Sequence, residues 1–411
     1  MPVPVHTESE LHAIKKNDHV ILKDSISLTE TPSYTFSTFT GELNGNNHTI
    51  TGLTNPLFEK IEDGMIQDLT LSGAHITTDQ EKIGTLCQIC ENSTLTNVTV
   101  QDSTVQTGKK TGGLVGKVQD SYIQNCLVKT SEVKNGRHSG GIVGVALGGT
   151  ITRCESECKI QDCSKAGGIA ETITRGCTVK NCKNNGDISA EGCTGGLVGY
   201  NHLSVIKSCV NYGEINSQSV VGGVVGRLKG EGLKLENNGD VNGTKCVGGV
   251  IGINNSHTTE LTNTGTVIGD KLVGGVVGSN TLSVEKAKNT GLVNGEKVVG
   301  GLIGQLDASS KVEQQSLSDS YANCTVRGGD SVAGAIGEIE SGTSEIENVY
   351  YIGALHGTVF TNPIVGKKND SKILDKNVFW DTNIQIKNTP RIGTQKQLSE
   401  SDLNILVDLS L

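Results

Sequence analysis

Aromatic residues are scarce in this chain of 411 residues, and their scarcity limits the kind of core that it can build. Phe, Tyr and Trp together make up 3% of the sequence, while glycine numbers 54. Large aromatic side chains usually fill broad globular cores. The hydrophobic residues are mostly Val, Ile and Leu, which suit strands whose side chains stack on copies of themselves. The composition therefore favours a narrow β core.

The sequence also has no long apolar run and no excess of basic residues. No stretch approaches the roughly 18–20 apolar residues that span a bilayer, so we expect no membrane insertion. The formal net charge of −9 and the few aromatics argue against nucleic acid as a partner. Residues 1–17 lack a basic region followed by an apolar stretch, so no secretory signal is expected. We therefore predict a cytoplasmic location, with the cell surface as the alternative if a signal was removed.

A five-residue motif of glycines and aliphatic residues recurs along the chain. Its intervals are 26–28 residues, with one of 33, and weaker versions precede and follow the series. The nine copies begin at Gly112, Gly140, Gly167, Gly195, Gly222, Gly248, Gly274, Gly300 and Ala333. A unit this short cannot bury its apolar face alone, so neighbouring units must stack. We predict an all-β fold, a single-stranded parallel β-helix (solenoid) of about twelve coils with short helical or irregular caps.

A second motif, Asn-x-Gly, keeps the same spacing and predicts ladders of identical residues. Each coil should contain an apolar strand, a turn, a further short strand and then the Asn-x-Gly turn, whose glycine can adopt a positive φ. Amides in register should bond to one another or to the turn backbone, with a ligand site as the alternative. The predicted ladders are Asn184, Asn211, Asn237, Asn263 and Asn289 for asparagine, and Gly186, Gly213, Gly239, Gly265 and Gly291 for glycine.

Cysteine is frequent, with twelve copies, and its spacing predicts a structural use. Four cysteines lie 27 or 28 residues apart and should occupy equivalent positions on successive coils. They are Cys126, Cys154, Cys182 and Cys209. Cys193 and Cys246 lie where other coils carry Val or Leu, so they should act as small hydrophobic residues. Buried reduced thiols are the favoured interpretation, and disulfides between stacked positions or zinc at Cys87-x-x-Cys90 remain alternatives.

The sequence shows no motif of a catalytic or cofactor site. The GGxxG copies lack a following Gly-Lys-Ser/Thr and lead into further strand, so they do not resemble phosphate loops. Asp187, Glu214 and Asp240 align after the turn glycines and are expected to be solvated, with a bound calcium ion as the alternative. We therefore predict no catalytic residue, no metal ligand and no cofactor.

The two ends of the repeat array are expected to be capped, because open sheet edges promote aggregation. We predict an N-terminal cap over residues 1–38, the solenoid over 39–372 and a C-terminal cap or tail over 373–411. The last segment contains the only tryptophan, Trp380, and ends in an apolar stretch that suggests a short helix.

A short helix is also predicted near the N-terminus, over Thr7–Lys16. Thr7 and Glu10 have the spacing of a capping box. Leu11 and Ile14 lie three residues apart, which places them on one helix face.

On these motifs the chain resembles the GLUG-motif repeat proteins, which occur in many bacterial and protist surface proteins and beside certain immunoglobulin A peptidases. The GGLVG segments at Gly112 and Gly195 match the motif, Phe39–Leu53 is similar to the opening segment of these arrays, and Val378–Asp381 to their closing segment. The resemblance implies a parallel β-solenoid that is usually a secreted or surface-displayed spacer or adhesion region without catalysis. None of the nine histidines lies in the His-Glu-x-x-His motif that the accompanying peptidase requires.

The function predicted from these features is a noncatalytic structural or protein-interaction β-solenoid, a scaffold or spacer that presents a rigid repeat face. We expect no enzyme activity, and a protein partner whose identity the sequence does not give. A surface adhesin-like protein and a carbohydrate-active β-helix enzyme are the alternatives, since the solenoid shape hosts such proteins. Association of the rods into a larger assembly stays open.

Overall fold

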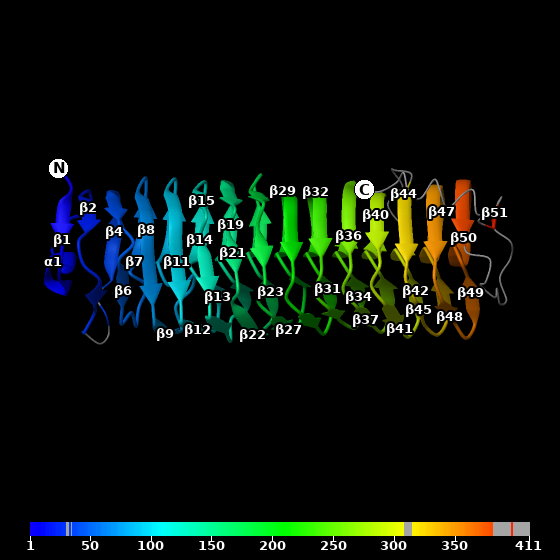
Figure 1. Ribbon diagram of the computed structural model, residues 1–411, viewed down its shortest axis with the longest axis horizontal. Helices are drawn as coiled ribbons and strands as arrows, with labels where there is room; N and C mark the ends of the chain where they lie inside the picture. The colour runs from blue at the N-terminus through cyan, green and yellow to red at the C-terminus, as the bar shows by residue number, and fades with distance from the viewer. Residues whose placement is uncertain (30–32, 34, 308–314, 381–395, 398–411) are drawn as a thin grey trace. The chain divides into compact units, whose positions relative to one another are not determined.

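The chain folds as an all-β parallel β-solenoid of about 12 turns, which confirms the predicted fold class (Figure 1). The computed structural model describes residues 1–29, 33, 35–307, 315–380 and 396–397. The chain divides into two compact units. The first comprises Met1–Gln218 and Val224–Glu231, and the second comprises Ser219–Gly223 and Gly232–Leu411.

The single helix of the described residues is α1 (Glu8–His12), and its capping box is formed as the sequence predicts. Thr7 Oγ1 accepts a hydrogen bond from Glu10 N (3.3 Å), and Glu10 Oε2 accepts one from Thr7 N (3.2 Å). Leu11 is buried, which anchors the helix. The helix ends at His12, earlier than predicted. No helix in the described part of the chain has the length and apolarity needed to cross a membrane.

Each coil of the first unit passes through three parallel sheets, more than the two short strands predicted for a coil. In one coil, β10 (Cys87–Glu91) and β11 (Thr94–Gln101) lie in the first sheet, β12 (Thr104–Thr107) in the second and β13 (Lys110–Gly112) in the third. The next coil repeats the path in register, and Cys87 at the start of β10 pairs with Val115. The chain can turn between these short strands because single residues there adopt positive φ.

The remaining strands of the first unit follow the same path. Its first sheet also contains β1 (Val3–Val5), β2 (His19–Leu22), β3 (Ile26–Ser27), β4 (Phe36–Phe39), β5 (Glu42–Asn44), β6 (Thr49–Thr51), β7 (Phe58–Glu62), β8 (Met65–Ser72), β14 (Val115–Gln119), β15 (Tyr122–Gln124), β16 (Leu127–Lys129), β19 (Val143–Leu147), β20 (Thr150–Thr152), β21 (Glu155–Ser156), β24 (Ala170–Thr174), β25 (Thr178–Lys180), β26 (Lys183–Asn184) and β29 (Val198–Asn211). The second sheet adds β9 (His75–Thr78), β17 (Glu132–Lys134), β22 (Lys159–Cys163), β27 (Ile188–Ala190) and β30 (Ile215–Ser217), and the third adds β18 (His138–Gly140), β23 (Lys165–Gly167) and β28 (Thr194–Gly195).

The second unit has the same three-sheet path. Its first sheet contains the end of β32 (Val225–Asn237), β35 (Ile251–Asn254), β36 (Thr258–Asn263), β39 (Val277–Asn280), β40 (Ser283–Asn289), β43 (Ile303–Leu306), β44 (Gln315–Asn323), β47 (Ile336–Ile352), β50 (Val365–Trp380) and β51 (Lys396–Gln397). The second sheet contains β33 (Val241–Asn242), β37 (Val267–Gly269), β41 (Val293–Gly295), β45 (Val326–Arg327) and β48 (Leu355–His356). The third contains β31 (Val220–Gly222), β34 (Cys246–Gly248), β38 (Leu272–Gly274), β42 (Val298–Gly300), β46 (Ser331–Ala333) and β49 (Phe360–Asn362).

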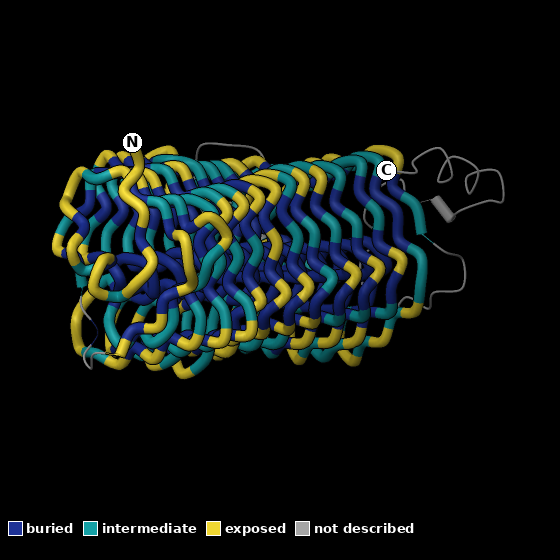
Figure 2. Tube along the Cα trace, turned by 60° about the vertical axis from the view of Figure 1, so that its left-hand side comes forward, coloured by how far each residue is buried: buried dark blue, intermediate teal, exposed yellow. Residues whose placement is uncertain are grey.

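The core of each unit consists of columns of stacked aliphatic side chains. Buried positions alternate with more exposed ones along the strands (Figure 2). In the first unit Leu95, Ile123, Ile151, Val179 and Ile206 pair in sequence and are all 0% exposed. Burying one such side chain stabilises the fold by roughly 1.5–3 kcal/mol. The spacing of the repeat therefore becomes a continuous apolar column.

The second unit has an equivalent column in its third sheet. Val247, Val273, Val299 and Val332 pair in sequence and are all fully buried. Small β-branched side chains fill this narrow core, which explains why so few aromatics are needed.

Parallel pairing begins at β1, inside the segment predicted as the N-terminal cap. Val3 of β1 pairs with Val20 of β2. The proposed boundaries at residues 38/39 and 372/373 stay predictions. The predicted helix near the C-terminus lies outside the described residues, whereas Trp380 ends β50.

Candidate functional site

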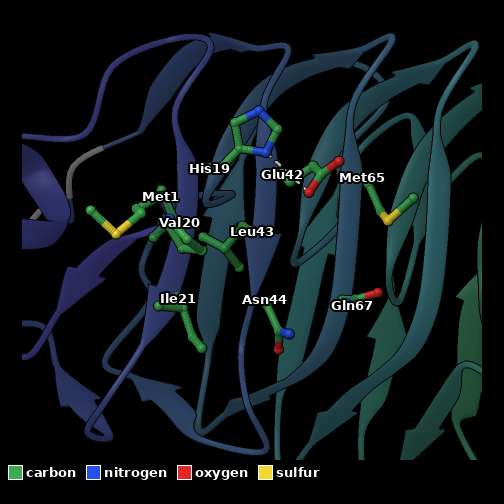
Figure 3. Close-up of a pocket in the computed structure, with 10 residues that line it drawn as sticks. Met1, His19, Val20, Ile21, Glu42, Leu43, Asn44, Met65 and Gln67 are labelled. Carbon is green, nitrogen blue, oxygen red and sulfur yellow. Dashed lines mark ion pairs between the residues drawn. The ribbon is translucent and has the colours of Figure 1, made fainter.

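A groove lies on the outer surface of the first coils of the first unit, over strands β2, β5 and β8 (Figure 3). Its volume is about 350 Å³. The strands pair so that His19, Glu42 and Met65 occupy one column and Ile21, Asn44 and Gln67 the next outward one. The lining consists of Met1, Pro2, His19, Val20, Ile21, Glu42, Leu43, Asn44, Met65 and Gln67. Stacking thus brings together side chains that lie more than twenty residues apart in the sequence.

The chemistry of the groove is that of a binding surface with one polar pair. His19 Nδ1 lies 3.1 Å from Glu42 Oε2, and the two side chains face each other (Figure 3). Both are more than half exposed, and the pair is ionic only when His19 is protonated, so it contributes little to stability. Met1 and Met65 expose flexible apolar side chains, which adapt well to varied partners. None of the ten lining residues is Ser, Thr or Cys, so the groove itself offers no hydroxyl or thiol nucleophile.

The asparagines predicted to form a ladder are buried and bond to one another within each unit. In the first unit Asn184 Nδ2 donates to Asn211 Oδ1 (2.8 Å). In the second unit Asn237 Nδ2 donates to Asn263 Oδ1 and Asn263 Nδ2 donates to Asn289 Oδ1, both at 2.8 Å. All five side chains are 0% exposed. Their Nδ2 groups therefore donate to the next amide or to the turn backbone, whereas Asn184 Oδ1, at the start of the ladder, accepts no hydrogen bond.

The corner glycines are explained by a different cause from the one predicted. The sequence suggested that they adopt positive φ, but the residues of positive φ include none of Gly186, Gly213, Gly265 or Gly291. Instead, a Cβ on Gly213 would lie 2.1 Å from the carbonyl oxygen of Gly186, and a Cβ on Gly265 would lie 2.0 Å from that of Gly239. The backbones of successive coils approach so closely at this corner that no side chain fits.

The positions that do adopt positive φ form another corner, which the sequence analysis missed. Asp68, Asn97 and Asn125 have φ of 52°, 55° and 52° and recur at the coil spacing. Asn and Asp tolerate this conformation better than other residues with a side chain. Their exposed side chains also form a ladder, since Asn97 Nδ2 donates to Asp68 Oδ1 (2.8 Å) and Asn125 Nδ2 to Asn97 Oδ1 (3.2 Å). An Asn/Asp residue every 28 or 29 positions was the signal that could have revealed it.

The aligned acidic residues bond to the backbone of the neighbouring coil. Asp187 Oδ1 accepts a hydrogen bond from Glu214 N (2.9 Å) in the first unit, and Asp240 Oδ1 accepts one from Thr266 N (2.8 Å) in the second. Asp187 and Asp240 thus contribute to coil stacking, because each accepts a hydrogen bond from a backbone N–H of the next coil.

The four stacked cysteines are buried, and none of the twelve cysteines, all of which the structure describes, is in a disulfide. The predicted column of Cys126, Cys154, Cys182 and Cys209 lies inside the first unit. Cys246 pairs with Val220 and Leu272, the aliphatic positions with which it was aligned, and is half-buried.

Thiol titration should count twelve reactive groups in denaturant and few in the native protein. Burial raises the pKa of Cys158, Cys163 and Cys177 from 9.0 to about 12, so these thiols remain protonated and unreactive in the folded state. Only the half-buried Cys193 and Cys246 should react quickly with a thiol reagent under native conditions. Fewer than twelve thiols in denaturant, without added reductant, would indicate disulfides.

The same shifts predict a loss of stability in alkali. Because the folded pKa lies above the unfolded value, the stabilisation is complete below pH 9.0 and falls as pH rises from there towards about 12. Denaturant unfolding across this pH range would measure the effect.

The fold and the groove define a parallel β-solenoid protein with a shallow groove of about 350 Å³ on its first coils. A family model matches residues 18–102, and it describes the N-terminal region of M26 IgA1-specific metallo-endopeptidases. A solved structure named IgA1 protease is similar with a TM-score of 0.43 and 18% identity, over 62% of this chain and 21% of that one. A putative immunoglobulin A1 protease from Bacteroides ovatus gives a TM-score of 0.23 and 14% identity, over 99% of this chain and 87% of that one. No curated protein matches.

These comparisons correct two predictions. The noncatalytic scaffold, with its adhesin-like and carbohydrate-active alternatives, is contradicted by the match of residues 18–102 to a metallo-endopeptidase region. The expectation of no enzyme activity is contradicted by the same match. Stacked repeats specify a shape, and a shape by itself does not identify a reaction, which is why the repeat pattern misled the functional prediction. The chain spans about a fifth of the first solved structure, 21% of its length.

The metal implied by a metallo-endopeptidase does not fit the residues described. Zinc requires three protein ligands, usually His, Glu or Asp, converging on one point. The described ranges bring together no group of three or more His, Cys, Asp or Glu side chains suited to a metal. We derive no catalytic step through a metal from these residues.

Proposed function

We propose that this protein takes part in proteolysis, and that its first coils bind the protein substrate of an IgA1-type metallo-endopeptidase. The observation that carries the proposal is that the match to the metallo-endopeptidase N-terminal region, residues 18–102, contains the groove strands β2, β5 and β8. The compartment remains the predicted cytoplasm or, as the alternative, the cell surface. The GLUG type of the repeat, which rests on the copies at Gly112 and Gly195, is likewise proposed.

The groove chemistry supports a protein substrate. Met1, Ile21 and Met65 provide apolar contacts, and Asn44 and Gln67 provide amide donors and acceptors for a backbone. A stacked scaffold holds these groups in fixed positions before binding, so little ordering entropy is lost when the substrate binds.

Binding of IgA1 to this chain tests the proposal, because the described residues bring together no metal site for cleavage by the chain itself. We expect measurable binding by the parent, and we expect Met65→Asp to raise the Kd about tenfold, because an apolar contact worth about 1.4 kcal/mol is lost. Tyr122→Asp is the matched control. Tyr122 lies in the same outward column two coils further on, has a similar exposure and is absent from the groove lining.

Absence of IgA1 binding by the parent would overturn the proposal. Equal effects of the two variants would show that the groove is not the binding site. Thermal unfolding of both variants should remain close to that of the parent, since both side chains are exposed.

A further inference from the structure

Basic side chains occupy successive coils at the start of the third sheet in the first unit. Lys110 pairs with His138, and His138 pairs with Lys165, so the three lie in register. Ile83 forms a parallel bridge with Thr111. Lys82, the residue before Ile83, therefore lies in the preceding coil beside Lys110, the residue before Thr111. Residues in register on adjacent parallel strands lie roughly 4.8 Å apart. We call Lys82, Lys110, His138 and Lys165 the basic column.

Lys117 lies close to this column, because the backbone of the preceding residue, Gly116, approaches Lys82 so closely that an added Cβ would lie 1.8 Å from the Lys82 carbonyl oxygen. Burial lowers the pKa of Lys117, and the positive charges of Lys82, Arg175 and Lys110 lower it further, against the opposite effect of Glu91. Lys117 Nζ donates to Gln119 Oε1 (2.9 Å), a neutral partner. Cations are therefore concentrated here although the whole chain carries a net charge of −9.

Two carboxylates near the column are already engaged with other groups. Glu81, which precedes Lys82 in the chain, has its Oε1 3.8 Å from Lys109 Nζ. Glu91 Oε2 lies 2.9 Å from Lys60 Nζ, and its other oxygen accepts a hydrogen bond from Gln119 Nε2 (3.1 Å). In the parts of the chain that the structure describes, no ion pair within 4.0 Å joins a carboxylate to Lys82, Lys110, Lys117 or Lys165.

Glu171 is a buried acidic group beside the column. It takes the place of the last glycine of the repeat motif, is 2% exposed, and its Oε2 lies 3.2 Å from His138 Nδ1. Thr172 Oγ1 donates to the same oxygen (2.6 Å). The two groups form an ion pair only when His138 is protonated, and no hydrogen bond joins His138 Nδ1 to the carboxylate. Glu171 forms no ion pair with the flanking lysines, which can therefore meet an external anion.

We propose that the basic column, with Lys117 beside it, binds an acidic segment of a partner protein. A row of lysines without carboxylate partners is complementary in charge to a run of carboxylates. Several cations in a row can each pair with one carboxylate and so compensate for the hydration that the carboxylates lose on binding. Nucleic acid fits less well, because single strands need aromatic stacking platforms and the column contains none. A long polyanion would extend over the rest of the surface and be repelled by the net negative charge of the chain. A short acidic segment would interact mainly with the lysines of the column, because salt screens the more distant charges. This surface does not depend on the groove or on peptidase activity.

Binding of a fluorescein-labelled, glutamate-rich peptide to the full chain tests the inference by fluorescence anisotropy. We expect the parent to bind with an affinity that falls as salt rises, and Lys110→Glu with Lys165→Glu to weaken the Kd at least tenfold. The matched control is Lys180→Glu with Lys207→Glu. These two lysines also pair in register on adjacent coils of the first unit, and the double variant changes the net charge by the same amount. It should change the Kd less than twofold.

Three results would overturn the inference. They are absence of peptide binding by the parent at low salt, equal weakening by the two double variants, and preferential binding of a single-stranded oligonucleotide at the same lysines. Circular dichroism of each variant confirms folding, and Lys110→Arg with Lys165→Arg, which keeps the charge, should retain binding.

Discussion

Replacing Gly213 by alanine should destabilise the protein by about 3 kcal/mol, one of the largest effects expected of a single methyl group. The added Cβ would lie 2.1 Å from the carbonyl oxygen of Gly186 and 2.7 Å from its carbonyl carbon. Both are backbone atoms of the neighbouring coil, so no side chain can move aside and the two coils must separate locally. Urea unfolding should show a lower midpoint with an unchanged slope.

Two other glycines separate the effect of space from that of backbone conformation. A Cβ on Gly108 meets no atom within 4 Å and needs no positive φ, so Gly108→Ala should be close to neutral. A Cβ on Gly176 also has open space, but its φ of 73° should make Gly176→Ala cost about 1 kcal/mol. If Gly213→Ala changes the free energy of unfolding as little as Gly108→Ala does, the inferred close approach of the coils at this corner is contradicted.

Substituting Asn263 by leucine should destabilise the second unit by about 3 kcal/mol. Asn263 Nδ2 donates to Gly265 O and to Asn289 Oδ1, and Asn263 Oδ1 accepts from Asn237 Nδ2, all at 2.8 Å. Leucine leaves these buried polar partners without hydrogen bonds, and the cost of an unsatisfied buried group exceeds the net gain of the bond itself. Asn294→Ala, at an exposed position of β41, is the control and should change stability by less than about 0.5 kcal/mol.

The variant Asn263→Asp adds a dependence on pH that a purely steric effect would lack. A carboxylate at this position cannot donate, whereas the protonated acid can still donate one hydrogen bond. Burial should raise the folded pKa of this carboxyl above its unfolded value near 3.9, so the variant should be most stable at low pH and lose stability as pH rises through and above that value. A variant whose stability relative to the parent is constant with pH would contradict the hydrogen-bonded amide ladder.

The ladders could be predicted from the sequence because stacking places equal positions on top of one another. A repeat of 26–28 residues that conserves its own pattern of Val, Asn and Gly within one chain fixes the register, as the pairing of Asn237 with Asn263 and of Val247 with Val273 shows. The third sheet could not be predicted in this way. The positive-φ corner at Asn97 carries Asp or Asn in the first coils, but Arg, Ser, Lys and Glu also occupy it further along, so no single motif marks it through the whole array.

The sequence alone determined the stacking of coils, their register and the residues that fill the core, because these depend only on a period and on side chains that match their own copies. The groove and the basic column were decided by the tertiary structure. They join outward residues such as His19, Glu42 and Met65, which differ from coil to coil and carry no repeat signal. The role of the corner glycines was decided there too, since the distance between two backbones is a property of packed coils and not of either segment by itself.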